Sequence, residues 1–476
     1  MRNLLGFWTS VLLCVTAFAA IEAAKRNVVC YYGSWAVYRP GDGKFDVEDI
    51  DPTICTHLMF GFAALDNQTY KIVAFDPWND LYADGGRGAY ERFVALKNQN
   101  PRAKAILAIG GWNEGSVKYS YMAASPERRK GFVDSVVPFL QRYGFDGLDM
   151  DWEYPTQRGG VAEDRENFIE LLRELKAAFA PYGLLLTAAV SPGEQVIDEA
   201  YDIPIVSELL DIINLMTYDY HGAWEQWTGH NAPLFAHPLD DGNVTNFNVN
   251  FTLNHWISNG APPSKIHLGM PFYGRGFMLD DPLENGPYAP ASEPLEPGPY
   301  SRTEGFWGYN EICEKQTTET GWTVVRNEYY KAPYTFKDRY WIGYDDYDSL
   351  TEKLKFVIAY DLGGAMVWSI ETDDFRGNCH SRRFPLLHHV WEDLNGEVAP
   401  CVDCTVPTSA PPTNEQCPHE GYFAIDCTNY YYCQLVPDGG YQISYFTCPP
   451  GTAINVDIGG CDHDYNVPGC GLRGVV

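Results

Sequence analysis

The stretch FDGLDMDWEYP, residues 145–155, decides which fold this chain can form. Asp149, Asp151 and Glu153 stand at every second position, and apolar residues separate them. Side chains at alternate positions of a β-strand point to the same face, roughly 7 Å apart at each step. The stretch therefore predicts a strand that carries a row of three acids on one face.

A row of acids on the inner face of a buried strand is energetically expensive. Burial and mutual repulsion disfavour the charged forms, so the pKa of at least one of these carboxyl groups is expected to rise. A carboxyl group that keeps its proton near neutral pH can act as a general acid. A metal site is the alternative interpretation, since carboxylate rows also bind Mg²⁺ or Ca²⁺. The flanking Met150, Trp152 and Tyr154 disfavour a solvated acidic edge, and proton transfer is the preferred interpretation.

Apolar runs of strand length recur on both sides of this stretch. With it, they span residues 27–32, 56–64, 105–109, 147–151, 184–190, 212–217, 266–271 and 365–369. Amphipathic stretches of helical period lie between most of them, as at 127–143 and 163–179. Strands that alternate with helices in this way favour an α/β fold with a closed parallel barrel, the TIM (β/α)8 barrel, over an open sheet. The aromatic, turn-rich segment 274–345 is expected to be an α+β insertion after the seventh strand.

An aromatic or acidic residue stands at or just beyond the C-terminal end of most predicted strands. These residues are Tyr31, Trp35, Phe60, Trp112, Glu153, Tyr218, Asp219, Tyr273 and Trp368. Barrel enzymes build their active sites at that face of the barrel. Any single aromatic residue could equally belong to the core, but its recurrence on strand after strand predicts a site there.

The first 24 residues have the three parts of a secretory signal. Arg2 gives a charged start, residues 12–20 are apolar, and small residues suited to cleavage stand between 17 and 24. Such a segment is too short for a transmembrane helix. Glycosylation sequons at Asn67, Asn243 and Asn250 fit the same route. No apolar run of about 20 residues follows, so we expect a secreted, extracellular protein that does not span a bilayer.

The charge balance excludes two classes of partner. The chain has 34 Lys and Arg against 63 Asp and Glu, a formal net charge of −29. A polyanion repels phosphate backbones and anionic lipid head groups. We therefore expect neither nucleic-acid binding nor membrane binding.

The cysteines divide the chain into two parts of different kinds. Cys14 lies in the signal, so twelve of the 13 cysteines remain, and in an oxidising compartment an even number indicates disulfides. Four are scattered over residues 25–397, whereas eight crowd into 401–470. The Pro- and Thr-rich segment 398–416 is expected to be a linker between the barrel and a small disulfide-rich domain at 417–470.

The spacing of the acids resembles a family signature. Asp146-x-x-Asp149-x-Asp151-x-Glu153 is similar to the DxxDxDxE motif of the family 18 glycoside hydrolases, the chitinases. Further matches stand in family order: CYYGSW at 30–35, FGFA at 60–63, AIGGW at 108–112, MTYDYHG at 216–222, PFYGRGF at 271–277 and GAMVWSIETDD at 364–374. They extend over the whole barrel, which makes the resemblance specific.

The resemblance implies that the protein hydrolyses β-1,4 linkages between N-acetylglucosamine units of chitin by a retaining, substrate-assisted mechanism. Glu153 would be the general acid and then the base. Asp151 would share a proton with Asp149 and turn toward the acetamido nitrogen of the substrate. Tyr218 would hydrogen-bond the acetamido group, and Asp219 would help to hold the distorted sugar. No cofactor and no metal are implied.

The resemblance also implies a cleft for sugar rings. Trp368 would form its floor, and Met216 would line the pocket beneath. The other substrate-binding candidates are Tyr31, Trp35, Phe60, Gly111, Trp112, Tyr154, Trp224, Tyr273 and Arg275. One position departs from the family pattern, because this chain has Ala108 where the third-strand motif usually reads SxGG. We expect the lost hydroxyl to change the proton shared by Asp149 and Asp151 only slightly.

The disulfides implied by the resemblance are Cys30–Cys55 and Cys313–Cys379 in the barrel. The tail resembles the peritrophin-A type of chitin-binding module, which implies the pairs Cys417–Cys433, Cys427–Cys470 and Cys448–Cys461. Fifty-odd residues form too small a core on their own, so these three bonds would stabilise the module. Zinc is the alternative for a cysteine cluster, but the tail has no CxxC pair. Cys401 and Cys404 stay unassigned.

These observations lead to one functional hypothesis and one rival. The protein is expected to be a secreted, monomeric endochitinase whose tail anchors it to insoluble chitin. The rival is a catalytically weak chitin-binding lectin on the same barrel. The five residues on which catalysis would depend are Asp149, Asp151, Glu153, Tyr218 and Asp219, and because all are present the enzyme is preferred.

Overall fold

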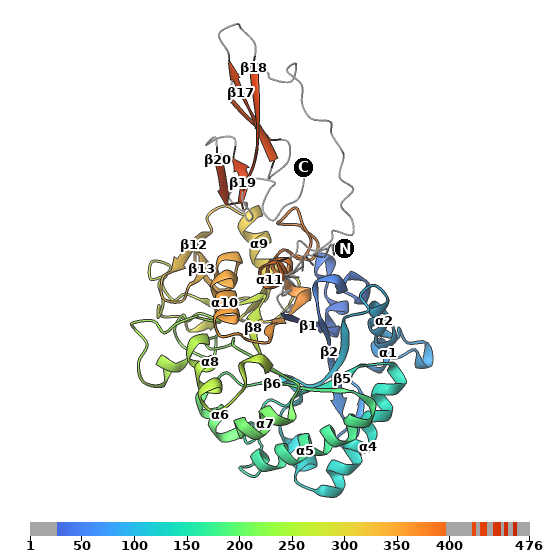
Figure 1. Cartoon of the computed structure of the whole chain (residues 1–476). Coiled ribbons are helices and arrows are strands. Elements are labelled where there is room, and N and C mark those ends of the chain that lie inside the picture. Colours follow the sequence, from blue (N-terminus) through green and yellow to red (C-terminus); the bar gives the residue numbers. More distant parts are fainter. Residues whose placement is uncertain are drawn as a thin grey trace, which may run out of the picture.

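Eight parallel strands form the centre of the molecule (Figure 1). The computed structural model describes residues 26–396 and, in the tail, 421–424, 429–435, 441–448, 452–455 and 460–463. The barrel strands are β1 (Asn27–Gly33), β2 (His57–Leu65), β4 (Lys104–Gly110), β5 (Gly147–Asp151), β6 (Leu185–Val190), β7 (Ile212–Leu215), β8 (Ile266–Pro271) and β15 (Gly364–Trp368). They pair in the order β1-β15-β8-β7-β6-β5-β4-β2, and β1 also pairs with β2. That last pairing closes the barrel and confirms the TIM-barrel prediction.

Helices surround the barrel and cover the outer faces of the strands (Figure 1). They are α1 (Pro77–Asp80), α2 (Ala89–Ala95), α3 (Val117–Ala123), α4 (Pro126–Tyr143), α5 (Asp164–Phe179), α6 (Glu194–Ala200), α7 (Ile203–Leu209), α8 (Val249–Ser258), α10 (Tyr347–Ala359) and α11 (Pro385–Asn395). A short strand, β3 (Ile72–Ala74), extends β2 as an antiparallel partner.

Helix α4 shows how the sequence sets these boundaries. The Ser125 hydroxyl accepts the N–H of Arg128 and caps the first turn, where Pro126 is tolerated because its missing N–H would have no helical partner. Gly144 ends the helix at φ 80°, a left-handed conformation that favours glycine. Phe132 and Leu140 lie on the buried face. The helix therefore agrees with the predicted stretch 127–143.

The predicted insertion is a second sheet between β8 and α10. It contains β9 (Tyr273–Met278), β10 (Glu293–Pro294), β11 (Phe306–Gly308), α9 (Tyr309–Thr318), β12 (Thr323–Asn327), β13 (Ala332–Lys337) and β14 (Tyr340–Gly343). The strands are antiparallel in the order β10-β9-β14-β13-β12, and β11 pairs with the first residues of β9 along the same edge as β10. Strand β9 leaves the barrel directly after β8, so the first residues of the insertion lie at the C-terminal face.

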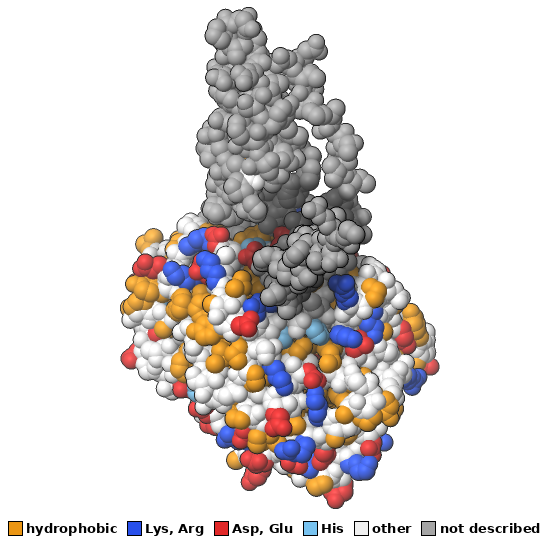
Figure 2. Space-filling model, viewed as in Figure 1, with side chains coloured by type: hydrophobic (Ala, Val, Ile, Leu, Met, Phe, Trp, Pro, Cys, Tyr) orange, Lys and Arg blue, Asp and Glu red, His pale blue; other side chains and the backbone are white. Residues whose placement is uncertain are grey.

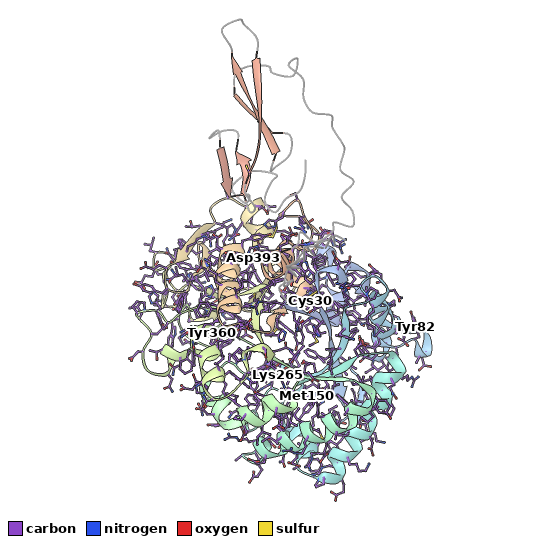
Figure 3. All side chains as sticks on the ribbon, in the orientation of Figure 1. Cys30, Tyr82, Met150, Lys265, Tyr360 and Asp393 are labelled. Atoms are coloured by element: carbon purple, nitrogen blue, oxygen red, sulfur yellow. A yellow bond between two sulfur atoms is a disulfide. The ribbon has the colours of Figure 1, made fainter. Side chains whose placement is uncertain are left out.

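Alternation along the strands separates two apolar clusters. On β1, Val28, Cys30 and Tyr32 face outward into the large cluster under the helices. Val29 and Tyr31 face inward into a smaller cluster with residues from β2, β4 and β15. The acids of β5 have the inward register, and Figure 3 labels Met150, which lies between two of them and belongs to the outer cluster.

Two disulfides fasten this body. Cys30 pairs with Cys55 and Cys313 pairs with Cys379, as predicted.

Figure 2 shows acidic and basic side chains interspersed over the visible face of the barrel. Within the described ranges, no helix is long and apolar enough to cross a membrane.

The described residues of the tail form two small antiparallel sheets. Strands β16 (Gly421–Ala424), β17 (Asn429–Leu435) and β18 (Tyr441–Thr447) form an antiparallel sheet, and β19 (Thr452–Asn455) pairs with β20 (Gly460–His463). Each of the three predicted tail disulfides includes a cysteine outside the described side chains. The predicted signal 1–24, the linker 398–416, Cys401 and Cys404 also lie outside the described residues.

Candidate active site

The three acids form a column that rises from the barrel interior to its C-terminal rim. Asp149 is fully buried and Asp151 is 3% exposed, whereas Glu153 stands half-buried just beyond β5. Asp146, the first acid of the signature, lies at the opposite end of the strand. It accepts hydrogen bonds from Lys97 Nζ (2.8 Å) and from the backbone N–H of Ala105 (2.8 Å), so it belongs to the base of the barrel.

Asp149 is surrounded by hydrogen-bond donors. The Tyr31 hydroxyl donates to Oδ2 at 2.7 Å, the Thr187 hydroxyl donates to Oδ1, and Asn214 Nδ2 makes a longer contact of 3.4 Å. Burial raises the pKa of Asp149 above its usual range, and the three donors oppose that shift. The donors therefore favour Asp149 as an acceptor at the bottom of the row.

Among the described residues, no donor of this kind is found for Asp151. Its Oδ1 is buried and has no hydrogen-bond partner within the described residues. Burial, followed by the charges of Glu153 and Asp149, raises the pKa of Asp151 well above its usual range. A buried carboxyl group without donors keeps its proton, and its free oxygen leaves it able to bond a new neighbour.

Glu153 has the properties of a general acid near neutral pH. Burial is the largest cause that raises its pKa, to about 7, and the charge of Asp219 adds to the rise. A hydrogen bond with Tyr154 and the charge of Arg158 act in the opposite direction. A carboxyl group of this pKa can donate a proton and later accept one at neutral pH.

One wall of the site joins the loop after β7 to the insertion. Asp219 accepts the Tyr273 hydroxyl (2.6 Å) and a bidentate pair from Arg275, 2.7 Å from Nε and 2.8 Å from Nη2. Asn231 joins the same two segments, since its Oδ1 accepts the N–H of Asp219 (3.0 Å) and its Nδ2 donates to the carbonyl of Tyr273 (3.1 Å). Tyr218, the neighbour of Asp219, is 5% exposed and its hydroxyl contacts Met366 Sδ at 3.6 Å.

Trp368, the residue expected to form the floor of the cleft, belongs to a group of aromatic rings. The ring centre of Trp368 lies 5.9 Å from that of Phe62 and 6.1 Å from that of Trp35. Trp35 stacks on Phe62 with an interplanar angle of 12°. Met216 lies in the inner cluster, against which Tyr154 and Trp368 pack. Such rings offer flat apolar surfaces of the kind that sugar rings pack against.

The prediction that Phe60 lines the cleft is wrong. Phe60 faces outward into the large apolar cluster, where it packs edge-on against Tyr90 (4.9 Å) and Phe93 (5.2 Å). Phe62 instead packs against the inner cluster and contacts the rings of Trp35 and Trp368. The pairing of β2 with β4 shifts register between Gly61 and Ala63, and this irregularity brings Phe62 to the inner side.

Two other predicted cleft residues, Tyr31 and Gly111, are buried beside the acid row. Tyr31 is 1% exposed, with its hydroxyl on Asp149 and its ring centre 5.5 Å from that of Trp368, so its side chain lies inside the barrel and not at its surface. Gly111 is buried with φ 85°, and its N–H donates to the carbonyl of Asp151 at 2.8 Å. A Cβ at this position would lie 2.9 Å from the Phe62 ring, which explains the glycine.

Two exposed tryptophans stand beside guanidinium groups. Trp112 is 58% exposed, and Arg158 lies over its ring at 3.6 Å. Trp224 is 60% exposed, and Arg275 lies 5.4 Å from its ring centre. A guanidinium over an indole ring is a favourable contact that orients the ring.

Besides Phe62, four residues of the site were not among the predicted ones: Thr187, Asn214, Asn231 and Arg158. Thr187 and Asn214 stand on the inward faces of β6 and β7, where polar residues in otherwise apolar runs were the available signal. Asn231 and Arg158 lie in loops, and no periodicity points to them.

One cluster outside the acid row has the spacing of metal ligands. It contains Cys313, Asp374, Cys379 and His380. Its two cysteines form a disulfide, and Asp374 accepts the backbone N–H groups of Asn378, Cys379 and His380. These contacts indicate a structural turn.

Comparisons with known proteins agree with this geometry. The family model for glycosyl hydrolases family 18 matches residues 27–373, and the model for the chitin-binding Peritrophin-A domain matches residues 417–470. "Probable chitinase 2" of Drosophila melanogaster is 43% identical over 401 residues, which cover 78% of this chain and 79% of that protein.

Two solved structures extend the comparison. The Ostrinia furnacalis Group IV chitinase in complex with allosamidin is 46% identical with a TM-score of 0.74, over 77% of this chain and 97% of that one. Human YKL-39, described as a pseudo-chitinase that retains chitooligosaccharide binding, is 37% identical with a TM-score of 0.72, over 78% of this chain and 99% of that one.

Proposed function

The chain belongs to glycosyl hydrolase family 18 and carries a C-terminal Peritrophin-A domain, and we propose that it is a secreted endochitinase that acts by a retaining, substrate-assisted mechanism. The observation that carries the proposal is the acid row. Its lowest member accepts bonds from three donors, Oδ1 of its middle member has no partner among the described residues, and its outermost member has a pKa of about 7.

In the first step, Glu153 gives its proton to the glycosidic oxygen as the bond from that oxygen to the anomeric carbon breaks. The acetamido carbonyl oxygen of the substrate forms a new bond to the anomeric carbon, which gives an oxazolinium ion. Asp151 turns from Asp149 toward the acetamido nitrogen, and Tyr218 hydrogen-bonds the acetamido group. Because the substrate supplies the nucleophile, no protein side chain forms a covalent bond.

In the second step, Glu153 acts as the base. It takes a proton from a water molecule, whose oxygen attacks the anomeric carbon and opens the oxazolinium ring. Two displacements at the same carbon leave its configuration unchanged. Asp219, held by Tyr273 and Arg275, supports the distorted sugar, and Trp368 with Trp35 and Phe62 supplies the surface on which sugar rings stack.

The tail is assigned to attachment. A Peritrophin-A domain at the end of the chain would bind the insoluble polymer and raise the local concentration of the barrel on it. Chitin polymer and its oligomers are the proposed ligands, and the protein would act outside the cell as a monomer.

A chitin-binding lectin is the second candidate, because YKL-39 has a similar fold and is a pseudo-chitinase. The complete acid row, and Asp219 with its bonds to Tyr273 and Arg275, favour hydrolysis in this chain. A metal-dependent hydrolase fits less well, because hydrogen-bond donors surround Asp149. A metal-dependent hydrolase would lose its activity when a chelator is added, whereas the proposed mechanism predicts no loss.

Glu153→Gln tests the proposal. With the full chain and a hexamer of N-acetylglucosamine, we expect turnover to fall by about 10²–10⁴-fold, the usual contribution of a general acid. Binding of the hexamer should persist, because glutamine has nearly the same size. Product lengths from the wild-type protein would establish whether it cleaves internally. A variant with a near-wild-type rate, or a wild-type protein that binds the hexamer without cleaving it, would refute the enzyme.

A further inference from the structure

Asp149 lies in a row of residues that crosses three neighbouring strands. Its register partner on β4 is Ala108, and its register partner on β6 is Thr187. Adjacent strands are about 4.8 Å apart, so the side chains at positions 108 and 187 flank Asp149 at the same depth in the barrel. Both face the interior, since Ala108 belongs to the inner cluster and Thr187 hydrogen-bonds Asp149.

The two flanks of Asp149 differ in what they offer. Thr187 is fully buried and donates its hydroxyl to Oδ1, whereas Ala108 has no polar group. Tyr31 donates to the other oxygen from β1, and the Asn214 contact is longer at 3.4 Å. Position 108 on β4 thus lacks a hydroxyl, and the register-equivalent position 187 on β6, the other neighbour of β5, has one.

We propose that Thr187 is a positioning residue for hydrolysis, which holds Asp149 as an ionised acceptor and supplies from β6 the hydroxyl that a serine at position 108 would supply from β4. This inference rests on the proposed function. When Asp151 turns toward the substrate, it takes the shared proton and leaves a full negative charge on Asp149. Donated hydrogen bonds stabilise a buried carboxylate, so the Thr187 and Tyr31 hydroxyls lower the energy of the turned state.

The charges around Asp149 support this assignment. The titratable groups that face it are Asp151 on the same strand, Tyr31 on β1 and Tyr218 in the loop after β7. Across residues 26–396, no Lys, Arg or His side chain hydrogen-bonds Asp149. Stabilisation of the carboxylate therefore depends on neutral donors, and the removal of one should have a measurable effect.

Thr187→Val tests the role with little change of shape, because valine replaces the hydroxyl by a methyl group. We expect kcat on the hexamer to fall about 10-fold or more, the value of one hydrogen bond to a charged group, with KM nearly unchanged. The acidic limb of the kcat profile should move to higher pH, since Asp149 without this donor is protonated more readily. Thr187→Ser should stay close to wild type.

The opposite flank provides the control. Ala108→Ser in the Thr187→Val background should restore most of kcat and return the acidic limb toward lower pH. Ala108→Ser alone adds a donor and should move that limb below its wild-type position, a test that does not require the Thr187→Val protein to fold. An unchanged profile in Thr187→Val, or no recovery in the double variant, would overturn the inference. A wild-type protein without activity on the hexamer would instead refute the proposed function.

Discussion

The two ends of the acid row show how one strand prepares chemically different carboxyl groups. Asp149, at the lower end, accepts bonds from Tyr31 and Thr187 and has no contact with solvent. Glu153, at the upper end, is half-buried between the charges of Asp219 and Arg158. We infer that the lower acid serves as a hydrogen-bond acceptor and the upper acid as a proton donor. Asp151 stands between them, and its Oδ1 has no hydrogen-bond partner among the residues that the structure describes.

The largest effect after that of Glu153 should come from this middle acid. We expect Asp151→Ala to lower kcat on the hexamer by about 10²–10³-fold, as does the loss of other groups that stabilise charge developing in a transition state. Asp146→Asn is the matched control, because Asp146 belongs to the same signature but binds Lys97 and Ala105 at the base of the barrel. Its kcat should remain near wild type. Equal losses in the two variants would show that the middle position has no special role.

A smaller effect is expected from the charges at the upper end. The hydrolysis needs Glu153 in its protonated form, so kcat/KM of the wild-type protein should fall about tenfold per pH unit above pH 7. Arg158 lowers the pKa of Glu153 and Asp219 raises it. Arg158→Met should therefore move the alkaline limb to higher pH, and Asp219→Asn should move it to lower pH. Shifts of the same sign in both variants would contradict this electrostatic account.

The smallest effect concerns stability. The pKa of Asp151 is raised in the folded state, so this group favours folding less as the pH rises above its unfolded pKa of about 4. Asp151→Asn removes that dependence. The gain in melting temperature over wild type should therefore be larger at pH 8 than at pH 5, which a thermal melt at the two pH values would measure. A gain that is the same at both values would mean that Asp151 is not protonated in the folded protein.

The barrel and the acid row could be predicted from the sequence because both depend on local pattern. Alternation placed Asp149, Asp151 and Glu153 on one face, and apolar runs separated by amphipathic stretches indicated the parallel strands. The insertion was predicted because one long segment, residues 274–345, lacks this alternation of apolar runs and amphipathic stretches. The barrel disulfides and the order of the motifs came from the resemblance to the family.

The errors arose where local pattern does not determine direction. Phe60 and Phe62 stand on the same side of an ideal strand, and only the register shift between β2 and β4 separates them. Thr187 supports Asp149 through a pairing between strands that are 38 residues apart in the chain. Asn231 acts through a loop that contacts the insertion. Contacts of this kind depend on tertiary pairing, which a single sequence does not display.

The most direct test of the central claim compares two leaving groups on the Glu153→Gln protein. A chitin oligomer has a sugar hydroxyl as leaving group, which needs a proton, whereas a dinitrophenyl glycoside of the N-acetylglucosamine dimer releases a stable anion that needs none. We expect the first-turnover rate of Glu153→Gln to fall about 10²–10⁴-fold on the oligomer and far less on the dinitrophenyl glycoside. Equal losses on both substrates would contradict the assignment of Glu153 as the proton donor.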